Sequence, residues 1–171
     1  AIRTICNFIE YWGNPAATAA AFSPDGYFLT GDIGYLDEDG YLFIVDRKKD
    51  IIIRGGENIS CQEVEAAIYQ HPAVAETAVF GLADERFGEV PGAVVLLRDG
   101  EALSTEDLCA FLFEHIAAFK VPARIWFVDQ ALPRLGTEKI DKGMLRATYR
   151  ALAAAGGCAP PPPPPRRLEG S

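Results

Sequence analysis

Apolar and polar positions alternate differently along the chain, and the first zone, residues 1–48, has the pattern of strands and turns. Tyr27–Thr30 and Tyr41–Val45 are rich in the aromatic and β-branched side chains that favour strands. Asp37–Gly40 lies between these runs and has the composition of a turn. The pattern therefore predicts a β-hairpin, for which no partner sheet is visible in the sequence.

The second zone, residues 49–155, alternates helical and strand patterns. Ser60, followed by Glu63, and Ser104 stand where helix N-caps are expected, and apolar residues then recur at helical spacing. Pro72 and Pro122 end these two helices, and a third helix runs from about Lys142 to Gly156–Gly157. Their inward faces carry Val64, Ala67 and Ile68, then Leu108, Phe111, Leu112 and Ile116, and finally Leu145, Tyr149 and Leu152.

Three short apolar runs between these helices read as strands. They are Thr77–Phe80, Ala93–Leu97 and Ile125–Val128, and the polar loop Asp84–Glu89 separates the first two. The sequence thus predicts a small α+β domain with a three-stranded sheet and flanking helices, preceded by the hairpin segment.

The stretch "VDRKKDIIIRGGENIS", Val45–Ser60, fits neither a strand nor an amphipathic helix. It places the charged residues Asp46–Lys49 before the β-branched run Ile51–Ile53 and then before the glycine pair Gly55–Gly56. This charged joint separates the first zone from the second, and we predict the domain boundary between residues 48 and 49.

The third zone, residues 156–171, contains six consecutive prolines, Pro160–Pro165. Such a run forms an extended polyproline II rod, which either docks in an aromatic groove of a partner or remains a solvated tail.

Composition narrows the function classes. The 171 residues are 49% hydrophobic and 23% charged, as in one compact domain with appendages. The net charge of −8 argues against a nucleic-acid-binding surface, which must be basic. No apolar stretch reaches membrane-spanning length, and Ala1–Thr4 lacks the layout of a signal peptide, so a soluble, cytoplasmic protein is expected.

The four cysteines are widely spaced, and with two histidines they offer no zinc-type pairing, so no metal site is predicted. Cys61 and Cys109 fall on predicted helices, which favours packing over a nucleophilic role.

Four motifs in order carry a family resemblance. They are "YWGNPAAT" (Tyr11–Thr18), "GYFLTGDIGYLDEDGYLFIVDRKKD" (Gly26–Asp50), "IIIRGGENISCQEVE" (Ile51–Glu65) and "LPRLGTEKIDK" (Leu132–Lys142). Together they resemble the C-terminal part of the adenylate-forming enzymes, which include acyl-CoA synthetases, coumarate ligases, luciferases and adenylation domains of peptide synthetases. The resemblance covers residues 11 to about 150, and "DRKKDIIIRGGENI" is similar to the CoA-ligase branch.

The resemblance implies a two-domain acyl-CoA synthetase. A large N-terminal domain binds ATP, its Mg²⁺ and the carboxylic acid, and a small C-terminal domain rotates between two half-reactions. The first makes acyl-AMP and pyrophosphate, and the second transfers the acyl group to CoA. Residues 1–48 match the end of the N-terminal domain, which is the expected partner. The phosphate loop is absent from this sequence, so the chain is expected to be inactive alone.

The resemblance also assigns residues to the nucleotide and to the hinge. Asp32 matches a carboxylate that accepts hydrogen bonds from the ribose hydroxyls, and Arg47 matches a second ribose or phosphate contact. The alternative for Asp32 is a role as a turn residue. The alternative for Arg47 is a surface ion pair with Asp46 or Asp50. Lys49 matches the hinge, where a solvated side chain suits a backbone that must adopt two conformations.

Lys139 matches the lysine that enters the active site during adenylation, where an ammonium stabilises charge on the α-phosphate. A lone lysine is otherwise a solvated surface charge. Glu138 departs from the family, which usually has glycine there, and its carboxylate would repel ATP or pair with Lys139.

The remaining candidates concern thioester formation. Gly55, Gly56 and Glu57 resemble the loop of the family that borders the pantetheine channel, and the alternative is a simple glycine turn before the helix capped by Ser60. Aromatic and basic residues are candidates for base stacking and phosphate pairing with the CoA nucleotide, with core packing as the alternative for the two aromatic ones: Arg86, Phe87, Phe119 and Lys120. A rival interpretation is a noncatalytic scaffold whose polyproline tail recruits a partner.

Overall fold

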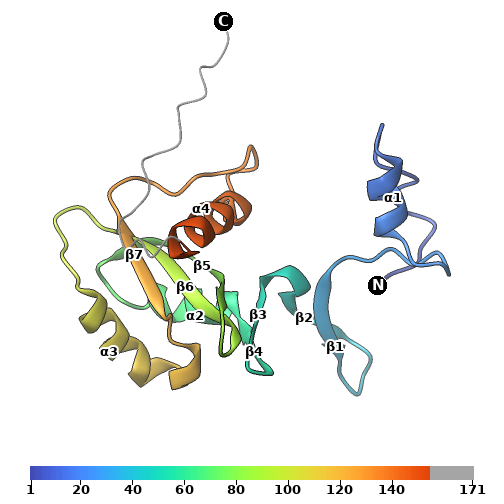
Figure 1. Cartoon of the computed structure of the whole chain (residues 1–171). Helices are drawn as coiled ribbons and strands as arrows, with labels where there is room; N and C mark the ends of the chain where they lie inside the picture. Colours follow the sequence, from blue (N-terminus) through green and yellow to red (C-terminus); the bar gives the residue numbers. More distant parts are fainter. Residues whose placement is uncertain (155–171) are drawn as a thin grey trace, which may run out of the picture. The chain divides into compact units, whose positions relative to one another are not determined.

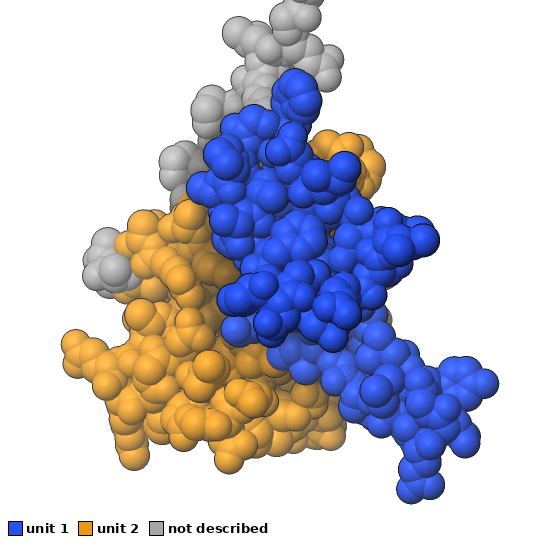
Figure 2. All heavy atoms as spheres, turned by 90° about the vertical axis from the view of Figure 1, so that its right-hand side faces the viewer, with its two compact units in different colours: residues 1–49 blue, residues 50–171 orange. Residues whose placement is uncertain are grey.

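The computed structural model describes residues 1–154. They fall into two compact units, unit 1 of residues 1–49 and unit 2 from Asp50 onward (Figure 2). The predicted polyproline rod and the Gly156–Gly157 helix end lie outside the described residues. None of the helices within residues 1–154 combines the length and the apolar character needed to cross a membrane.

Unit 1 contains helix α1 (Pro15–Ala21) and an antiparallel hairpin of β1 (Asp32–Leu36) and β2 (Leu42–Arg47) (Figure 1). The turn between the strands forms as predicted, because the Asp37 carboxylate accepts a hydrogen bond from the Tyr41 amide at 2.8 Å. The hairpin prediction is thus confirmed.

The predicted position of the first strand of this hairpin is wrong. The strand is β1 and not Tyr27–Thr30, where Phe28 makes only isolated bridges to Ile2 and Phe22. The aromatic character of that run serves a different purpose, since the Phe28 ring lies 5.1 Å from the ring of Phe8. The aromatic residues of Tyr27–Thr30 resemble those of a strand in composition, but Phe28 belongs to a small aromatic cluster.

Unit 2 is built on a five-stranded sheet, so the α+β class is confirmed and the predicted number of three strands is wrong. The order is β4-β3-β6-β5, with β7 parallel to β6. The predicted strands lie inside β5 (Val74–Asp84), β6 (Gly88–Leu97) and β7 (Arg124–Val128). The predicted Asp84–Glu89 loop shortens to Glu85–Phe87 because β5 and β6 pair as far as Asp84 and Gly88.

The two additional strands come from the stretch that fitted no pattern. β3 (Ile51–Arg54) and β4 (Glu57–Ser60) form a hairpin, and the connecting Gly55 and Gly56 have φ of +58° and +94°. Positive φ at both central residues of a two-residue turn requires residues such as glycine. The run of isoleucines concealed the alternation of this strand, in which Ile52 is 1% exposed and Ile53 is 56% exposed.

Helices α2 (Cys61–Tyr69), α3 (Thr105–His115) and α4 (Lys142–Ala154) cover the two faces of the sheet (Figure 1). The predicted N-caps are present: the hydroxyl of Ser60 accepts from the Glu63 amide at 3.2 Å, and that of Ser104 from the Asp107 amide at 3.0 Å. α3 ends at His115, before the predicted Pro122. Short 3-10 helices η1 (Lys48–Asp50) and η2 (Ala118–Lys120) complete the elements.

Two apolar cores result from the alternation of β5, β6 and β7. The first lies under α2 and α3 and includes Val79 and Val95, and the second lies under α4 and includes Phe80 and Trp126. The break after α3 allows Ile116 and Phe119 to pack against the first core. Unit 2 is therefore a three-layer domain whose sheet is buried on both sides.

Candidate functional site

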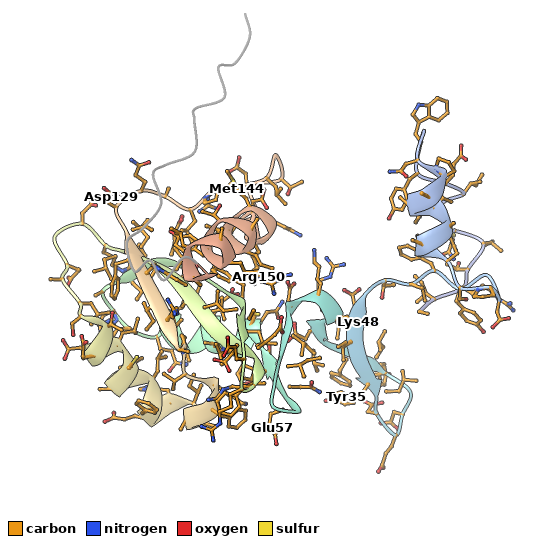
Figure 3. The ribbon with its side chains drawn as sticks, viewed as in Figure 1. Tyr35, Lys48, Glu57, Asp129, Met144 and Arg150 are labelled. Carbon is orange, nitrogen blue, oxygen red and sulfur yellow. The ribbon has the colours of Figure 1, made fainter. Side chains whose placement is uncertain are left out.

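Two hairpin turns of unit 2 meet at one end of its sheet. The amide of Gly55 donates to the carbonyl oxygen of Phe87 at 2.8 Å, and a Cβ at Gly55 would lie 3.4 Å from the Phe87 ring. The guanidinium carbons of Arg54 and Arg86 lie 4.3 Å and 4.9 Å from the centre of that ring. The hairpin-tip cluster, as we call it, consists of these four residues together with Gly56 and Glu57: Arg54, Gly55, Gly56, Glu57, Arg86 and Phe87. Figure 3 labels Glu57.

The hairpin-tip cluster joins a guanidinium pair, an aromatic ring and a glycine turn. Such a group can pair with phosphate and stack on a base, and its glycines allow a ligand close to the backbone. Sequence reasoning named Arg86 and Phe87 but missed Arg54, whose contact with the ring depends on a pairing of distant strands. Phe87 also packs against the second core, so its ring has a structural role as well.

Phe119 and Lys120 are held elsewhere in the unit. The ammonium of Lys120 lies 2.6 Å from a carboxylate oxygen of Glu63 on α2, and Phe119 packs against the first core. Lys120 is thus connected to α2, and Phe119 has the alternative role of a core residue.

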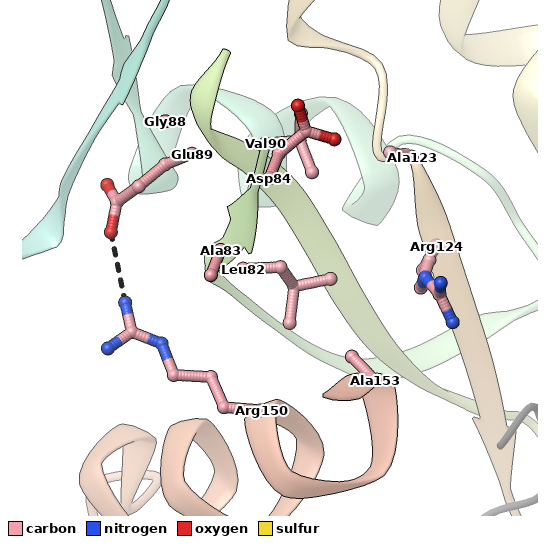
Figure 4. A pocket seen from close by; sticks show the side chains of 10 residues that line it. All are labelled: Leu82, Ala83, Asp84, Gly88, Glu89, Val90, Ala123, Arg124, Arg150 and Ala153. Carbon is pink, nitrogen blue, oxygen red and sulfur yellow. Dashed lines mark hydrogen bonds and ion pairs between the residues drawn. The ribbon is translucent and has the colours of Figure 1, made fainter. Parts of the chain in front are cut away.

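Hydrogen bonds to the carboxylate of Glu89 hold β3, which leads into the hairpin-tip cluster, against the rest of unit 2. The carboxylate of Glu89 on β6 accepts from the Ile53 amide at 3.2 Å and from Arg150 of α4 at 3.0 Å. Because β3 pairs with β6 only at Arg54 and Gly88, this carboxylate adds a further hydrogen bond between the two strands. The same Glu89–Arg150 pair lines a hollow of about 360 Å³ (Figure 4).

Lys139 lies at the end of a tight turn, with its side chain exposed. The Leu135 amide donates to the Lys139 carbonyl at 2.8 Å, and the Glu138 amide donates to the Leu135 carbonyl at 3.0 Å. Glu138 has φ of +62°, the one positive value at a non-glycine residue among residues 1–154. This left-handed backbone explains physically why glycine is favoured where this chain has glutamate.

Replacing Glu138 with glycine is therefore expected to raise the free energy of unfolding by about 0.5–1 kcal/mol, since the strain of a left-handed residue exceeds the entropy cost of glycine. Chemical denaturation of the chain measures this change. Glu138→Ala is the matched control, because it removes the carboxylate but keeps the strained Cβ. Equal stabilisation by both variants would assign the effect to charge instead of backbone strain.

Asp32 and Arg47 face each other across the unit 1 hairpin. Their Cα positions are paired in the β1–β2 register, and the Nε atom of Arg47 lies 3.0 Å from Oδ1 of Asp32. Arg47 also donates to the Thr30 carbonyl at 3.1 Å. Both side chains are accessible, at 47% and 31%. The ion-pair partner of Arg47 is thus Asp32 and not Asp46 or Asp50, and such an exposed pair adds little to stability.

Lys49 is the last residue of unit 1 and is exposed within η1. Asp50, the first residue of unit 2, is only 8% exposed, and its carboxylate lies 3.5 Å from the guanidinium of Arg146 on α4. The chain thus passes from an exposed residue to an anchored one at the boundary between units.

Cys61 and Cys109, the two cysteines between residues 50 and 154, are packing residues. Cys61 is fully buried, and burial raises its pKa to about 12, so its thiol is neutral at physiological pH. Burial likewise raises the pKa of Cys109. Within residues 1–154, no three His, Cys, Asp or Glu side chains lie together as metal ligands would.

Residues 63–139 match the family model of the AMP-binding enzyme C-terminal domain. This chain contains an AMP-binding enzyme C-terminal domain. It is 51% identical over 130 residues to 2-succinylbenzoate–CoA ligase of Geobacillus kaustophilus, covering 76% of this chain and 26% of that protein. It is 44% identical over 142 residues to the long-chain-fatty-acid–CoA ligase FadD13 of Mycobacterium tuberculosis, covering 83% and 28%.

Two solved structures of related enzymes are similar to this chain in fold and in sequence. ATP-bound MatB from Rhodopseudomonas palustris matches with a TM-score of 0.73 and 39% identity, over 84% of this chain and 28% of that one. MenE from Bacillus subtilis with its acyl-adenylate intermediate matches with a TM-score of 0.69 and 39% identity, over 80% and 28%. The chain is therefore homologous to the C-terminal part of acyl-CoA ligases and spans little more than a quarter of their length.

Proposed function

We propose that this chain is the C-terminal part of an acyl-CoA ligase, which converts a carboxylic acid, ATP and CoA into acyl-CoA, AMP and pyrophosphate. The observation that carries the proposal is the 51% identity over 130 residues to a CoA ligase. A similarity of this extent reaches into both units, since 130 residues exceed the 122 residues of unit 2 from Asp50 to Ser171.

In the first half-reaction, a carboxylate oxygen of the substrate attacks the α-phosphorus of ATP, the bond to the β-phosphate breaks, and pyrophosphate leaves. The ammonium of Lys139 stabilises the negative charge that gathers there, and a charge placed for the transition state lowers the barrier directly. Asp32 accepts hydrogen bonds from the ribose hydroxyls, and Arg47, already oriented by Asp32 and Thr30, contacts the ribose or a phosphate.

In the second half-reaction, unit 2 rotates at Lys49 and brings a different surface to the acyl-adenylate. Gly55, Gly56 and Glu57 then border the pantetheine arm of CoA, and the guanidinium of Arg86 pairs with its phosphates. Gly56 supports this role, because the space where its Cβ would lie is open and a ligand can approach the backbone closely.

The proposed partner of this chain is an N-terminal domain that holds ATP, Mg²⁺ and the acyl substrate. Unit 1 supports this partner, because its hairpin exposes large apolar side chains on both faces, including Tyr35 at 56% and Leu36 at 66% on β1 and Leu42 at 59% and Ile44 at 64% on β2. Exposed apolar surface of this kind is typical of an interface.

This function is tested by identifying the products that the intact protein makes. By the intact protein we mean this chain joined to the proposed N-terminal domain. Carboxylic acid and ATP are expected to give AMP and pyrophosphate, with acyl-CoA forming when CoA is added. The isolated chain of 171 residues is expected to exchange no pyrophosphate into ATP with any acid. Exchange by the isolated chain, or release of ADP by the intact protein, would contradict the proposal.

A further inference from the structure

The segment that carries Lys139, residues 132–141, is attached to the scaffold of unit 2 at its upstream end by one carboxylate. Glu76 on β5 accepts a hydrogen bond from the Leu132 amide at 2.9 Å through Oε2, and its Oε1 pairs with the guanidinium of Arg134. The side chain of Glu76 is only 18% exposed, and Leu132 is 4% exposed. The side chain of Arg134 is 41% exposed. The upstream end of this segment is thus tied to the sheet by a largely buried main-chain hydrogen bond and by a more exposed ion pair.

Arg134 extends this attachment to the residue beside Lys139. Its Nη2 atom pairs with Glu76, and its Nη1 atom donates to the carbonyl oxygen of Glu138 at 2.8 Å. The planar fork of a guanidinium bridges two acceptors in a fixed geometry, which a lysine ammonium does not reproduce. The contact lies on the carbonyl of the one left-handed non-glycine residue of the described chain, whose conformation is otherwise disfavoured.

The downstream end is attached separately. The ammonium of Lys142 lies 2.7 Å from Oε1 of Glu65 on α2, and the same oxygen accepts from the Val79 amide at 2.7 Å. Burial raises the pKa of Glu65, and the Lys142 ammonium opposes this shift. The Asp141 carboxylate accepts from the Met144 amide at 2.9 Å and so caps α4. Both ends of the segment are therefore fixed, and Glu76 with Arg134 fixes its turn.

We infer that Glu76 and Arg134 are positioning residues for Lys139, which hold the turn preformed so that the ammonium reaches the α-phosphate without further ordering. This inference rests on the proposed function. It predicts an effect on adenylation alone, because thioester formation uses the hairpin-tip cluster. Catalysis is sensitive to such placement, since a small displacement of a catalytic group lowers the rate strongly.

The test compares Arg134→Gln with Arg98→Gln in the intact protein. Arg98 also donates to a backbone carbonyl, that of Pro72 at 2.9 Å, but it lies outside the Lys139 segment. Arg134→Gln is expected to lower kcat for pyrophosphate exchange about tenfold, with the KM for ATP and thioester formation from supplied acyl-AMP nearly unchanged. Arg98→Gln is expected to change neither half-reaction. Equal loss in both half-reactions, or no loss for Arg134→Gln, overturns the inference.

Amide hydrogen exchange provides a readout that does not depend on activity. In Arg134→Gln and Glu76→Gln, the Leu135 and Glu138 amides should exchange faster while the amides of β5 and β6 keep their protection. Unchanged protection of the turn contradicts the inference. If the unmodified intact protein forms no acyl-adenylate, the proposed function fails instead; if it does and Lys139→Ala abolishes this while Arg134→Gln retains it, only the positioning role fails.

Discussion

Replacing Lys139 with alanine in the intact protein is expected to slow adenylation about a hundredfold or more, because the variant loses charge stabilisation of roughly 3 kcal/mol in the transition state. Thioester formation from supplied acyl-AMP should change little, since the proposed rotation of unit 2 moves the lysine away from the reacting atoms. The exposed side chain of Lys139 forms no ion pair within residues 1–154, and Glu138 contacts Arg134 only through its backbone carbonyl. The ammonium is thus available for a phosphate.

Pyrophosphate exchange and single-turnover thioester formation measure the two half-reactions separately. Lys139→Arg is the matched control, because it keeps the positive charge and should lose less activity than Lys139→Ala. Glu138→Gly should raise adenylation, since it removes a carboxylate beside the phosphate and relieves the strained backbone. Full exchange activity in Lys139→Ala would show that this protein does not use the lysine for adenylation.

Replacing Lys49 with proline is expected to spare adenylation and to slow thioester formation about tenfold or more, because proline fixes φ near −65° and restricts rotation between the two poses. The exposed position of Lys49 beside the anchored Asp50 supports a pivot at this residue. The same two assays measure the effect.

Lys49→Ala separates rotation from charge. It removes the ammonium but leaves φ unrestricted, so its thioester rate should remain well above that of Lys49→Pro. Equal losses of both half-reactions in Lys49→Pro would indicate misfolding or a pivot at another residue.

Local signals made much of the fold predictable. Ser60 and Ser104 cap their helices through contacts three residues away, which any single sequence displays. The strand Ile51–Arg54 was missed because three isoleucines conceal a period of two, which appears only when Ile52 enters a core and Ile53 does not. Tertiary packing decides such cases.

The site was less accessible to sequence reasoning. Lys139 is a surface lysine by composition, and only its motif distinguishes it from others. The partners of the turn were not predictable, because Glu76 and Arg134 lie 58 residues apart and meet through the fold. Arg54 was missed for the same reason. Long-range contacts of this kind depend on strand pairing that periodicity does not specify.

The central claim is that Lys139 and Lys49 serve different half-reactions of one acyl-CoA ligase. It is tested most directly by the ratio of the adenylation rate to the thioester-forming rate, measured for the unmodified protein, Lys139→Ala and Lys49→Pro under the same conditions. We expect this ratio to fall about a hundredfold in Lys139→Ala and to rise about tenfold in Lys49→Pro. A ratio that stays at its original value in both variants would contradict it.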